Sequence, residues 1–502
     1  MSKTKVPFVL QLPSDFSLEM AFRCLCARPG CLWLDSSSRG QETDAPLARL
    51  SRYSFLTSDP IKTLEAWTGD ASPWPTLHQW QRELPENLDP DLPPFQGGIA
   101  GLWGYESATW LEDVGIPDNQ DLNTPAVSLG LYDWVVASDH QLNTSWLICQ
   151  GEFHSDWEQR CHLAAQRSQQ IQRWLGLEIP LNDFDEDTKA TAALEMQVAN
   201  EAAVGSEIQA RVEKDESIRD KQFQTSLSGI QSNFSSNAFQ QAVAGIVQGI
   251  CNGDSFQVNL AQRLLTEASL PSSDLYLKLR QTNPAPFSAY YSRRDFQVLS
   301  SSPEGFLQVR GEDVETRPIK GTVRRTGEPV TDGELAQKLI TSGKDRAENI
   351  MIVDLLRNDL SKVCEDDSVQ VTQLCGLETY QHVQHLVSVV RGKLAKSKTA
   401  SELLEACFPG GSVTGAPKVE AMKTIANLEP NPRGPYCGSI GYLGIGGQAD
   451  FNILIRTVTA VDGYLQFPVG GGITARSEPA AEEAETWAKA EGMLRAILPE
   501  RS

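Results

Sequence analysis

The chain has 502 residues, of which 40% are hydrophobic, and its formal net charge is −21. It is long enough to bury a large core, as one composite domain or as two. The negative charge argues against nucleic acids and anionic membrane surfaces as partners, and no N-terminal run resembles a signal peptide or a membrane-spanning helix, so we expect a cytoplasmic protein.

The first part of the chain alternates strand-like and helix-like segments. Residues 127–132 and 134–137 are rich in Val, Leu and aromatic residues, whereas residues 156–175 have a helical pattern. This mixture predicts an α/β (α+β) architecture, with a first domain over residues 1–178. The ten cysteines follow no recognised zinc spacing, so we expect free thiols.

Composition changes sharply in the middle of the chain. Residues 179–233 are rich in Asp, Glu, Ala, Ser and Gln and contain few large apolar side chains. Such a segment cannot bury enough apolar surface to order itself, so we expect an exposed, mobile linker. A second domain would then occupy residues 234–502.

One lysine of that second domain is a candidate nucleophile. Pro318 and Gly321 flank Lys320 and favour a strand-to-loop hairpin that presents the amine to a cleft. Glu304 follows a strand-like run, and a hairpin over residues 306–316 would bring Glu304 and Lys320 to neighbouring strand ends. A carboxyl group and an amine within reach of one substrate suit acid and nucleophilic catalysis. An exposed lysine on a turn is the alternative.

Two pairs of acidic residues are spaced three apart on predicted helices. Asp345 and Glu348 precede a long apolar stretch, and Glu482 and Glu485 follow Pro479, which favours a helix start. Four carboxylates that face one point would repel one another unless a divalent cation lay between them, and Mg²⁺ suits a few carboxylates, water and an anionic substrate. Solvated helix faces are the alternative.

Two glycine-rich stretches could bind anions through backbone amides. The first is a predicted loop over residues 469–474, with three consecutive glycines, and the second is residues 408–418. Neither matches the phosphate-binding GxxxxGK[ST] pattern, so nucleotide use is not indicated.

Taken together, six motifs resemble the chorismate-utilising enzymes. They occur in order and cover about residues 236–500: PIKGT (318–322), DRAENIMIVDLLRNDL (345–360), FPGGSVTGAPK (408–418), RGPYCGSIGY (433–442), FNILIRT (451–457) and GGGITARSEP (470–479). Residues 33–37 and 94–105 are similar to the N-terminal half of the large components of anthranilate and aminodeoxychorismate synthases. The resemblance implies an anthranilate-synthase-like, chorismate-binding fold of central β-sheets covered by helices.

The resemblance also narrows the reaction. Relatives that add water carry a lysine base in a strand that here begins at Gln257, and a neutral glutamine cannot abstract that proton. Anthranilate synthases usually have PIAGT where this chain has PIKGT. Lys320 therefore resembles the lysine of the aminodeoxychorismate synthase component I branch, which implies conversion of chorismate and ammonia to 4-amino-4-deoxychorismate through a lysine adduct, for para-aminobenzoate and folate biosynthesis.

Further roles follow from the resemblance alone. It implies that Lys320 attacks chorismate, that Glu304 protonates the departing hydroxyl and that Glu348 and Glu485 are the main Mg²⁺ ligands, with Asp345 and Glu482 nearby. The remaining substrate contacts would come from His385, Ser412, Thr322, Tyr436, Arg456, Gly470 and Gly472. Asp345 stands where some relatives have glutamate.

The expected partners are also implied by the resemblance. No glutaminase nucleophile motif is evident, so ammonia would be delivered by a separate glutamine amidotransferase subunit. The region 33–37 is a candidate tryptophan site. Two alternatives stay open, an anthranilate synthase large component and a catalytically silent chorismate-binding regulatory subunit.

Overall fold

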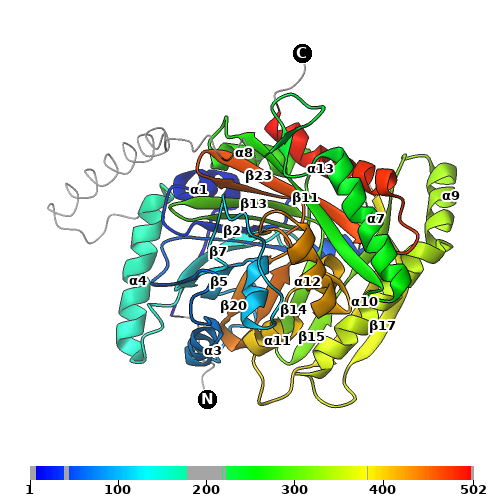
Figure 1. Ribbon diagram of the computed structural model, residues 1–502. Coiled ribbons are helices and arrows are strands. Elements are labelled where there is room, and N and C mark those ends of the chain that lie inside the picture. Colours follow the sequence, from blue (N-terminus) through cyan, green and yellow to red (C-terminus); the bar gives the residue numbers. More distant parts are fainter. Residues whose placement is uncertain (1–6, 39–44, 178–217, 219–221, 381–382, 499–502) are drawn as a thin grey trace.

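Two large antiparallel β-sheets with helices around them form the described part of the protein (Figure 1). The computed structural model describes residues 7–38, 45–177, 218, 222–380 and 383–498. The prediction of a mixed helix-and-sheet fold, with central sheets covered by helices, is confirmed. Within these residues, no helix combines the length and the apolar character needed to cross a membrane.

The larger sheet has 13 strands. In hydrogen-bonded order they are β1 (Phe8–Gln11), β8 (Thr144–Cys149), β7 (Trp134–Asp139), β3 (Tyr53–Thr57), β2 (Leu32–Asp35), β12 (Phe287–Ser292), β13 (Phe296–Ser302), β22 (Thr457–Val461), β23 (Tyr464–Ile473), β11 (Gln257–Glu267), β10 (Gln231–Ser232) and β9 (Phe223–Gln224), with β19 (Gly415–Ala416) against β11. Strands β2 and β12 join the two parts of the chain within this sheet.

The smaller sheet has ten strands. Their order is β16 (Ile319–Arg324), β18 (Val383–Lys393), β15 (Asp313–Thr316), β14 (Gly305–Arg310), β21 (Ala449–Asn452), β20 (Ser439–Gly444), β5 (Gly98–Trp103), β6 (Val127–Tyr132) and β4 (Lys62–Ala66), with β17 (Gln370–Thr379) beside β18. The expected hairpin is β14 and β15. Here too the two parts of the chain share one sheet, because β20 pairs with β5.

The core between the sheets follows from the alternation of side chains along each strand. In β7, Val135 faces a cluster shared by the two sheets, whereas Val136 faces the helices on the outer side. In β5, Leu102 faces the shared cluster and Trp103 the opposite side. Successive strand residues point to opposite faces, so strands that are apolar throughout can pack on both sides. The result is two sheets enclosed between outer helices.

The three helices predicted from the sequence are present in the structure. Asp156 caps the helix that follows it, Ser342 caps the helix of the first acidic pair, and Pro479 is the first residue of the helix of the second pair. The α-helices are α1 (Leu18–Leu25), α2 (Ala45–Leu50), α3 (Trp74–Glu83), α4 (Trp157–Trp174), α7 (Ser236–Asn252), α8 (Ser272–Thr282), α9 (Pro329–Ile340), α10 (Gly343–Ser361), α11 (Ala400–Cys407), α12 (Lys418–Leu428) and α13 (Pro479–Ile497).

Helices α10 and α13 cover the sheets next to the site. Helix α13 packs against β23 and against α7 and α8, and α10 packs against β16, β17 and β18 (Figure 1). Short 3₁₀ turns complete the fold at η1 (Tyr105–Trp110), η2 (Gly411–Val413) and η3 (Ile445–Gly447). All ten cysteines lie in the described residues and are free thiols.

The segment 179–233 was expected to be a linker. Most of it, residues 179–217 and 219–221, lies outside the described residues. Its last part is ordered as β9 and β10, which extend the larger sheet beyond β11. The sheets run without a break across the expected boundary between residues 1–178 and 234–502.

Candidate active site

A cavity of about 950 Å³ lies among β16, β18, β23, α10, α13 and η2. Twelve of the thirteen residues singled out from the sequence line it, the exception being Glu482: Glu304, Lys320, Thr322, Asp345, Glu348, His385, Ser412, Tyr436, Arg456, Gly470, Gly472 and Glu485. Glu482 is buried on α13 and does not line the cavity. The fold thus brings together segments that are far apart in the chain.

Lys320 and Glu304 meet in this cavity, but by a different route from the one expected. Lys320 lies inside β16 rather than in a hairpin loop, opposite Leu386 of β18, and Gly321 (φ +77°) marks a break in the strand register there. In sheet order, β18 and β15 separate β16 from β14, which Glu304 precedes. The contact is made instead because the Glu304 carboxyl accepts the amide hydrogen of Ile319.

One loop residue contacts both members of this pair. The Lys320 Nζ donates to the carbonyl oxygen of Ser412 at 3.0 Å, and the Ser412 hydroxyl hydrogen bonds to the Glu304 carboxyl. Ser412 belongs to η2, where the glycine-rich stretch 408–418 turns into the cavity. These contacts fix the amine and the acid on one side of the cavity.

Burial shifts the two groups toward their neutral forms. Loss of solvent lowers the pKa of the Lys320 ammonium, although Glu304 and Glu348 oppose the shift. Loss of solvent raises the pKa of Glu304, and Lys320 opposes that shift. A neutral amine beside a protonated carboxylic acid is the form that combines a nucleophile with a general acid.

His385 of β18 lies directly opposite Thr322 of β16, just past the register break between Lys320 and Thr322. The Thr322 hydroxyl and His385 Nδ1 are 2.8 Å apart, and the Tyr380 ring packs against the imidazole at 5.3 Å between centroids. Burial lowers the pKa of His385 to about 4. The imidazole is therefore neutral at pH 7 and can both donate and accept a hydrogen bond.

Tyr436 and Arg456 supply the polar groups of another wall. Burial raises the pKa of Tyr436 well above its usual value, so its phenol stays neutral, and burial lowers the pKa of Arg456. Arg456 has a positive φ of +54°, a conformation that only a well-determined surrounding holds in a residue other than glycine. A phenol and a guanidinium in one cavity suit recognition of a carboxylate.

The triple glycine was expected in a loop, and this is corrected by the structure. Gly470, Gly471 and Gly472 lie in β23, where they pair with β11. A Cβ at Gly470 would lie 2.4 Å from the Leu260 carbonyl oxygen, so side chains are excluded by close packing. Strand β22 pairs with β23 only as far as Gln466. Among the described strands, none pairs with the other edge of the glycines, which line the cavity with backbone.

The two acidic pairs converge beside these glycines. A Cβ at Gly471 would lie 3.5 Å from Glu485 Oε1 and 3.6 Å from Glu482 Oε2. On α10, Glu348 Oε1 is buried and has no hydrogen-bond partner among the described residues. Burial raises the pKa of Glu348, whereas Lys489 lowers the pKa of Glu485 despite its burial.

The same carboxylates are candidate ligands for magnesium. No three His, Cys, Asp or Glu side chains within the described ranges are close enough to hold a metal ion by themselves. Magnesium, however, is commonly held by one or two carboxylates, water and an anionic substrate. Glu348, whose Oε1 has no hydrogen-bond partner among the described residues, and the nearby Glu485 fit that smaller donor set.

Sequence reasoning missed two lysines in this region. Lys344 Nζ lies 3.6 Å from Glu482 and 4.0 Å from Glu348, and Lys489 Nζ lies 2.6 Å from Glu485 and 2.9 Å from the Gly470 carbonyl oxygen. The spacing of four residues between each lysine and a carboxylate was a usable signal.

Strand β11 contributes to the cavity one residue that sequence reasoning overlooked, Asn259. Asn259 lines the cavity opposite Gly472 in the sheet. Gln257, where relatives that add water have a base, is fully buried, and its side-chain amide has no hydrogen-bond partner among the described residues. It presents no charged group to the cavity.

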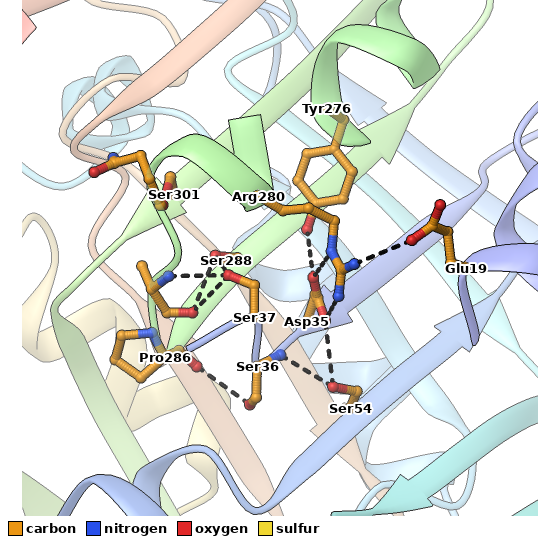
Figure 2. A network of polar contacts seen from close by, with 12 residues as sticks. Glu19, Asp35, Ser36, Ser37, Ser54, Tyr276, Arg280, Pro286, Ser288 and Ser301 are labelled. Atoms are coloured by element: carbon orange, nitrogen blue, oxygen red, sulfur yellow. Dashed lines mark hydrogen bonds and ion pairs between the residues drawn. The ribbon is translucent and has the colours of Figure 1, made fainter. Parts of the chain in front are cut away.

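The candidate tryptophan region at 33–37 forms an internal polar network (Figure 2). Asp35 binds Arg280 at 2.8 Å, the Ser36 hydroxyl donates to the Tyr53 carbonyl oxygen at 2.7 Å, and Ser37 Oγ accepts the Ala285 amide hydrogen at 2.9 Å. The Ser37 contact therefore fastens the segment 283–287, which lines one wing of the cavity, to the residues that follow β2.

Comparisons with known proteins identify the family of this chain. Residues 30–495 match the family model described as chorismate binding enzyme. The chain is 37% identical to aminodeoxychorismate synthase component 1 of Klebsiella aerogenes, over 97% of this chain and 98% of that protein. It is also 37% identical to anthranilate synthase component 1 of Synechocystis, over 89% and 88% of the two chains.

A solved structure agrees as well. The crystal structure of anthranilate synthase component I from Streptococcus pneumoniae superposes with a TM-score of 0.66 at 29% sequence identity, over 88% of this chain and 92% of the other. Equal identity to proteins with two different names leaves the choice of reaction to the residues of the cavity. The family itself is settled by the extent of the matches, and the chain belongs to the chorismate-binding enzymes.

Proposed function

We propose that the protein is component I of an aminodeoxychorismate synthase, which converts chorismate and ammonia to 4-amino-4-deoxychorismate and water for para-aminobenzoate and folate biosynthesis. The observation that carries the proposal is the Lys320 amine, which lies in the cavity beside the buried Glu304 carboxyl. Four curated relatives named aminodeoxychorismate synthase component 1, with 34–37% identity, support it.

In the first step, the neutral Lys320 amine attacks C2 of chorismate. The ring double bonds shift, the C4–O bond breaks, and Glu304 gives its proton to the departing hydroxyl, which leaves as water. The attached nitrogen then loses one proton to the Glu304 carboxylate. Burial favours the starting protonation of both groups, because it lowers the pKa of Lys320 and raises that of Glu304.

In the second step, ammonia attacks C4 and the double bonds shift back. The bond between C2 and the Lys320 nitrogen breaks, and Glu304 returns its proton to the departing amine. The new amino group then gives its extra proton to the Glu304 carboxylate, which restores the starting state of both groups. Two successive allylic displacements exchange hydroxyl for amine with retention at C4. The neutral His385 beside Thr322 would hydrogen bond to the C4 substituent.

Substrate orientation follows from the remaining walls. Tyr436 and Arg456 would hold the enolpyruvyl carboxylate with the backbone of Gly470 and Gly472. Glu348 and Glu485 would hold Mg²⁺ against the ring carboxylate, with Asp345 and Glu482 nearby. Bound Mg²⁺ would neutralise the ring carboxylate and fix its position.

Product identification tests this function directly. Purified protein is incubated with chorismate, ammonium and Mg²⁺, and the products are separated and identified by mass spectrometry. We expect 4-amino-4-deoxychorismate from the wild type and loss of this product from Lys320→Ala. Release of pyruvate with a fluorescent anthranilate product from the wild type would establish the second candidate, an anthranilate synthase large component, which the identity to the Synechocystis protein keeps in view.

The source of ammonia is a separate part of the proposal. We propose that a small glutamine amidotransferase subunit delivers it, in the cytoplasm, since the name component 1 of the relatives implies a second component. Mixing the two proteins should raise glutamine-dependent turnover above that supported by free ammonium. No gain on mixing would contradict the partnership.

Tryptophan binding is proposed for the wing of the cavity next to residues 33–37. Ser38, Leu50 and the segment 284–287 line this wing, and the network of Asp35 holds it in place. Isothermal titration with tryptophan, with phenylalanine as the control ligand, tests the proposal. Absence of a tryptophan-specific signal would refute it.

A further inference from the structure

Arg433 is a buried charge that no part of the proposed chemistry uses. It is 5% exposed and does not line the cavity. Its guanidinium binds Glu429 through Nη2 at 2.6 Å and through Nε at 2.9 Å. The guanidinium also donates two hydrogen bonds to backbone. Nη1 donates to the Val413 carbonyl oxygen at 2.9 Å, and Nη2 donates to the Asn259 carbonyl oxygen at 3.0 Å.

Those two backbone contacts tie two segments of the cavity wall to the loop that carries Arg433. Val413 lies in η2 next to Ser412, which holds Lys320 and Glu304, and Asn259 lies in β11. The third segment is the loop of Arg433 itself, in which the Tyr436 amide donates to the Arg433 carbonyl oxygen at 3.2 Å. One side chain therefore sets the spacing of three walls without touching the cavity.

Glu106 fastens the same loop from the other part of the chain. It lies in η1, is 7% exposed, and does not line the cavity. Its Oε1 accepts the amide hydrogen of Arg433 at 2.7 Å and its Oε2 that of Gly434 at 2.9 Å, while the Tyr105 amide donates to the Gly434 carbonyl oxygen at 2.8 Å. Gly434 has a φ of +59°, which turns two successive amides toward one carboxylate.

We propose that Glu106 and Arg433 are positioning residues for the substrate, a buried brace that holds the walls carrying Asn259, Ser412 and Tyr436 at the spacing chorismate requires. The inference rests on the proposed function, since chorismate is the ligand. It assigns residues before 178 a direct part in the geometry of the site. A buried charge set contributes little net stability compared with apolar packing, whereas its directional hydrogen bonds define geometry.

Glu106→Gln tests the brace with little change in volume. The amide side chain keeps one acceptor oxygen but turns an NH₂ group toward the other backbone amide, so one of the two hydrogen bonds is lost. Chorismate is titrated without ammonium into proteins that also carry Lys320→Ala, which cannot form the covalent adduct, and binding is followed by isothermal titration. We expect the dissociation constant to rise about tenfold, which corresponds to about 1.4 kcal/mol.

Asp133→Asn is the matched control. Asp133 is likewise a fully buried carboxylate that accepts a backbone amide hydrogen, from Glu152 at 3.1 Å, and pairs with an arginine, Arg167, at 3.4 Å. None of these residues lines the cavity. We expect this variant to lose thermal stability while its chorismate dissociation constant stays within about twofold of wild type.

The readouts separate positioning from stability. A purely structural role of Glu106 would lower the fraction of binding-competent protein, seen as stoichiometry, and leave the dissociation constant unchanged; that result overturns the inference. Arg433→Lys, which keeps the charge but cannot reach all three partners, should weaken binding similarly, and the two substitutions should not be additive. Wild-type protein that fails to bind chorismate would overturn the proposed function and this inference with it.

Discussion

At the scale of single residues, reactivity depends on one amine and one carboxyl that share a buried environment. Lys320 and Glu304 perturb each other: the carboxylate raises the pKa of the amine, and the ammonium lowers the pKa of the acid. Burial acts in the opposite direction on each and is the largest effect. The reactive state holds one proton between the two groups, on the acid.

Glu304→Gln should separate the contributions of the pair. Activity of the wild type should fall at low pH, where both groups are protonated, and at high pH, where both are deprotonated. The variant should be about 10²- to 10⁴-fold slower and should keep only the fall at low pH, because no acid remains to lose its proton. The measurement is kcat/KM for chorismate across the pH range. A variant that retains the fall at high pH would contradict the assignment of Glu304.

The sequence predicts these two residues but not how they meet. Pro318 and Gly321 indicate an unusual backbone around Lys320, and Gly321 does mark a register break. The approach of Glu304 depends on the amide of Ile319 and on Ser412, which lies 92 residues after Lys320. Such contacts depend on tertiary packing, which local patterns do not encode.

At the scale of elements, α10 and α13 present the carboxylates, and both helices are readable from the sequence. The Ser342 cap and Pro479 at the first helical position mark their starts. The glycines of β23 are misread as a loop because close strand packing and tight turns select the same residue. The relative placement of the helices, and hence of Lys344 among the carboxylates, needs the structure.

Lys344→Met should strengthen metal binding. The ammonium lies 3.6 Å from Glu482 and 4.0 Å from Glu348, so it competes electrostatically with a divalent cation. We expect the dissociation constant for Mg²⁺ to fall about tenfold, measured by isothermal titration in the absence of substrate. Lys338→Met on α9, an exposed position outside the cavity, is the control and should change nothing. An unchanged or weaker affinity in Lys344→Met would count against this site.

At the scale of the whole molecule, the two parts of the chain form one structure. Strands β2 and β12 join them in the larger sheet and β5 and β20 join them in the smaller one. The apolar cluster between the sheets draws residues such as Leu102 and Tyr291 from both parts. Short-range patterns predict individual strands well, but nothing local indicates that β2 pairs with a strand more than 250 residues later.

Separate expression tests this unity. Residues 234–502 alone would expose strands β12 and β20 as open edges and uncover the apolar cluster between the sheets. We expect this fragment to aggregate or to lack a cooperative thermal transition, measured by size-exclusion chromatography and circular dichroism. A monomeric fragment that unfolds cooperatively would show instead that the second part folds independently.

The formal net charge of −21 opposes the binding of an anionic substrate. An anionic substrate must enter a protein that repels it overall, so the positive groups in the cavity determine binding. Arg456, Lys344 and Lys489 line the cavity and supply positive charge there. Lys320, as a neutral amine, carries the covalent chemistry.

The most direct test is peptide mass spectrometry of protein incubated with chorismate and Mg²⁺ and rapidly quenched before ammonium is added. We expect a modified peptide at Lys320 whose mass increases by one chorismate minus one water. We also expect the modification to be lost when ammonium is supplied. Lys320→Ala should show no such peptide. An unmodified Lys320 peptide in protein that nevertheless forms 4-amino-4-deoxychorismate on addition of ammonium would contradict the covalent role of Lys320.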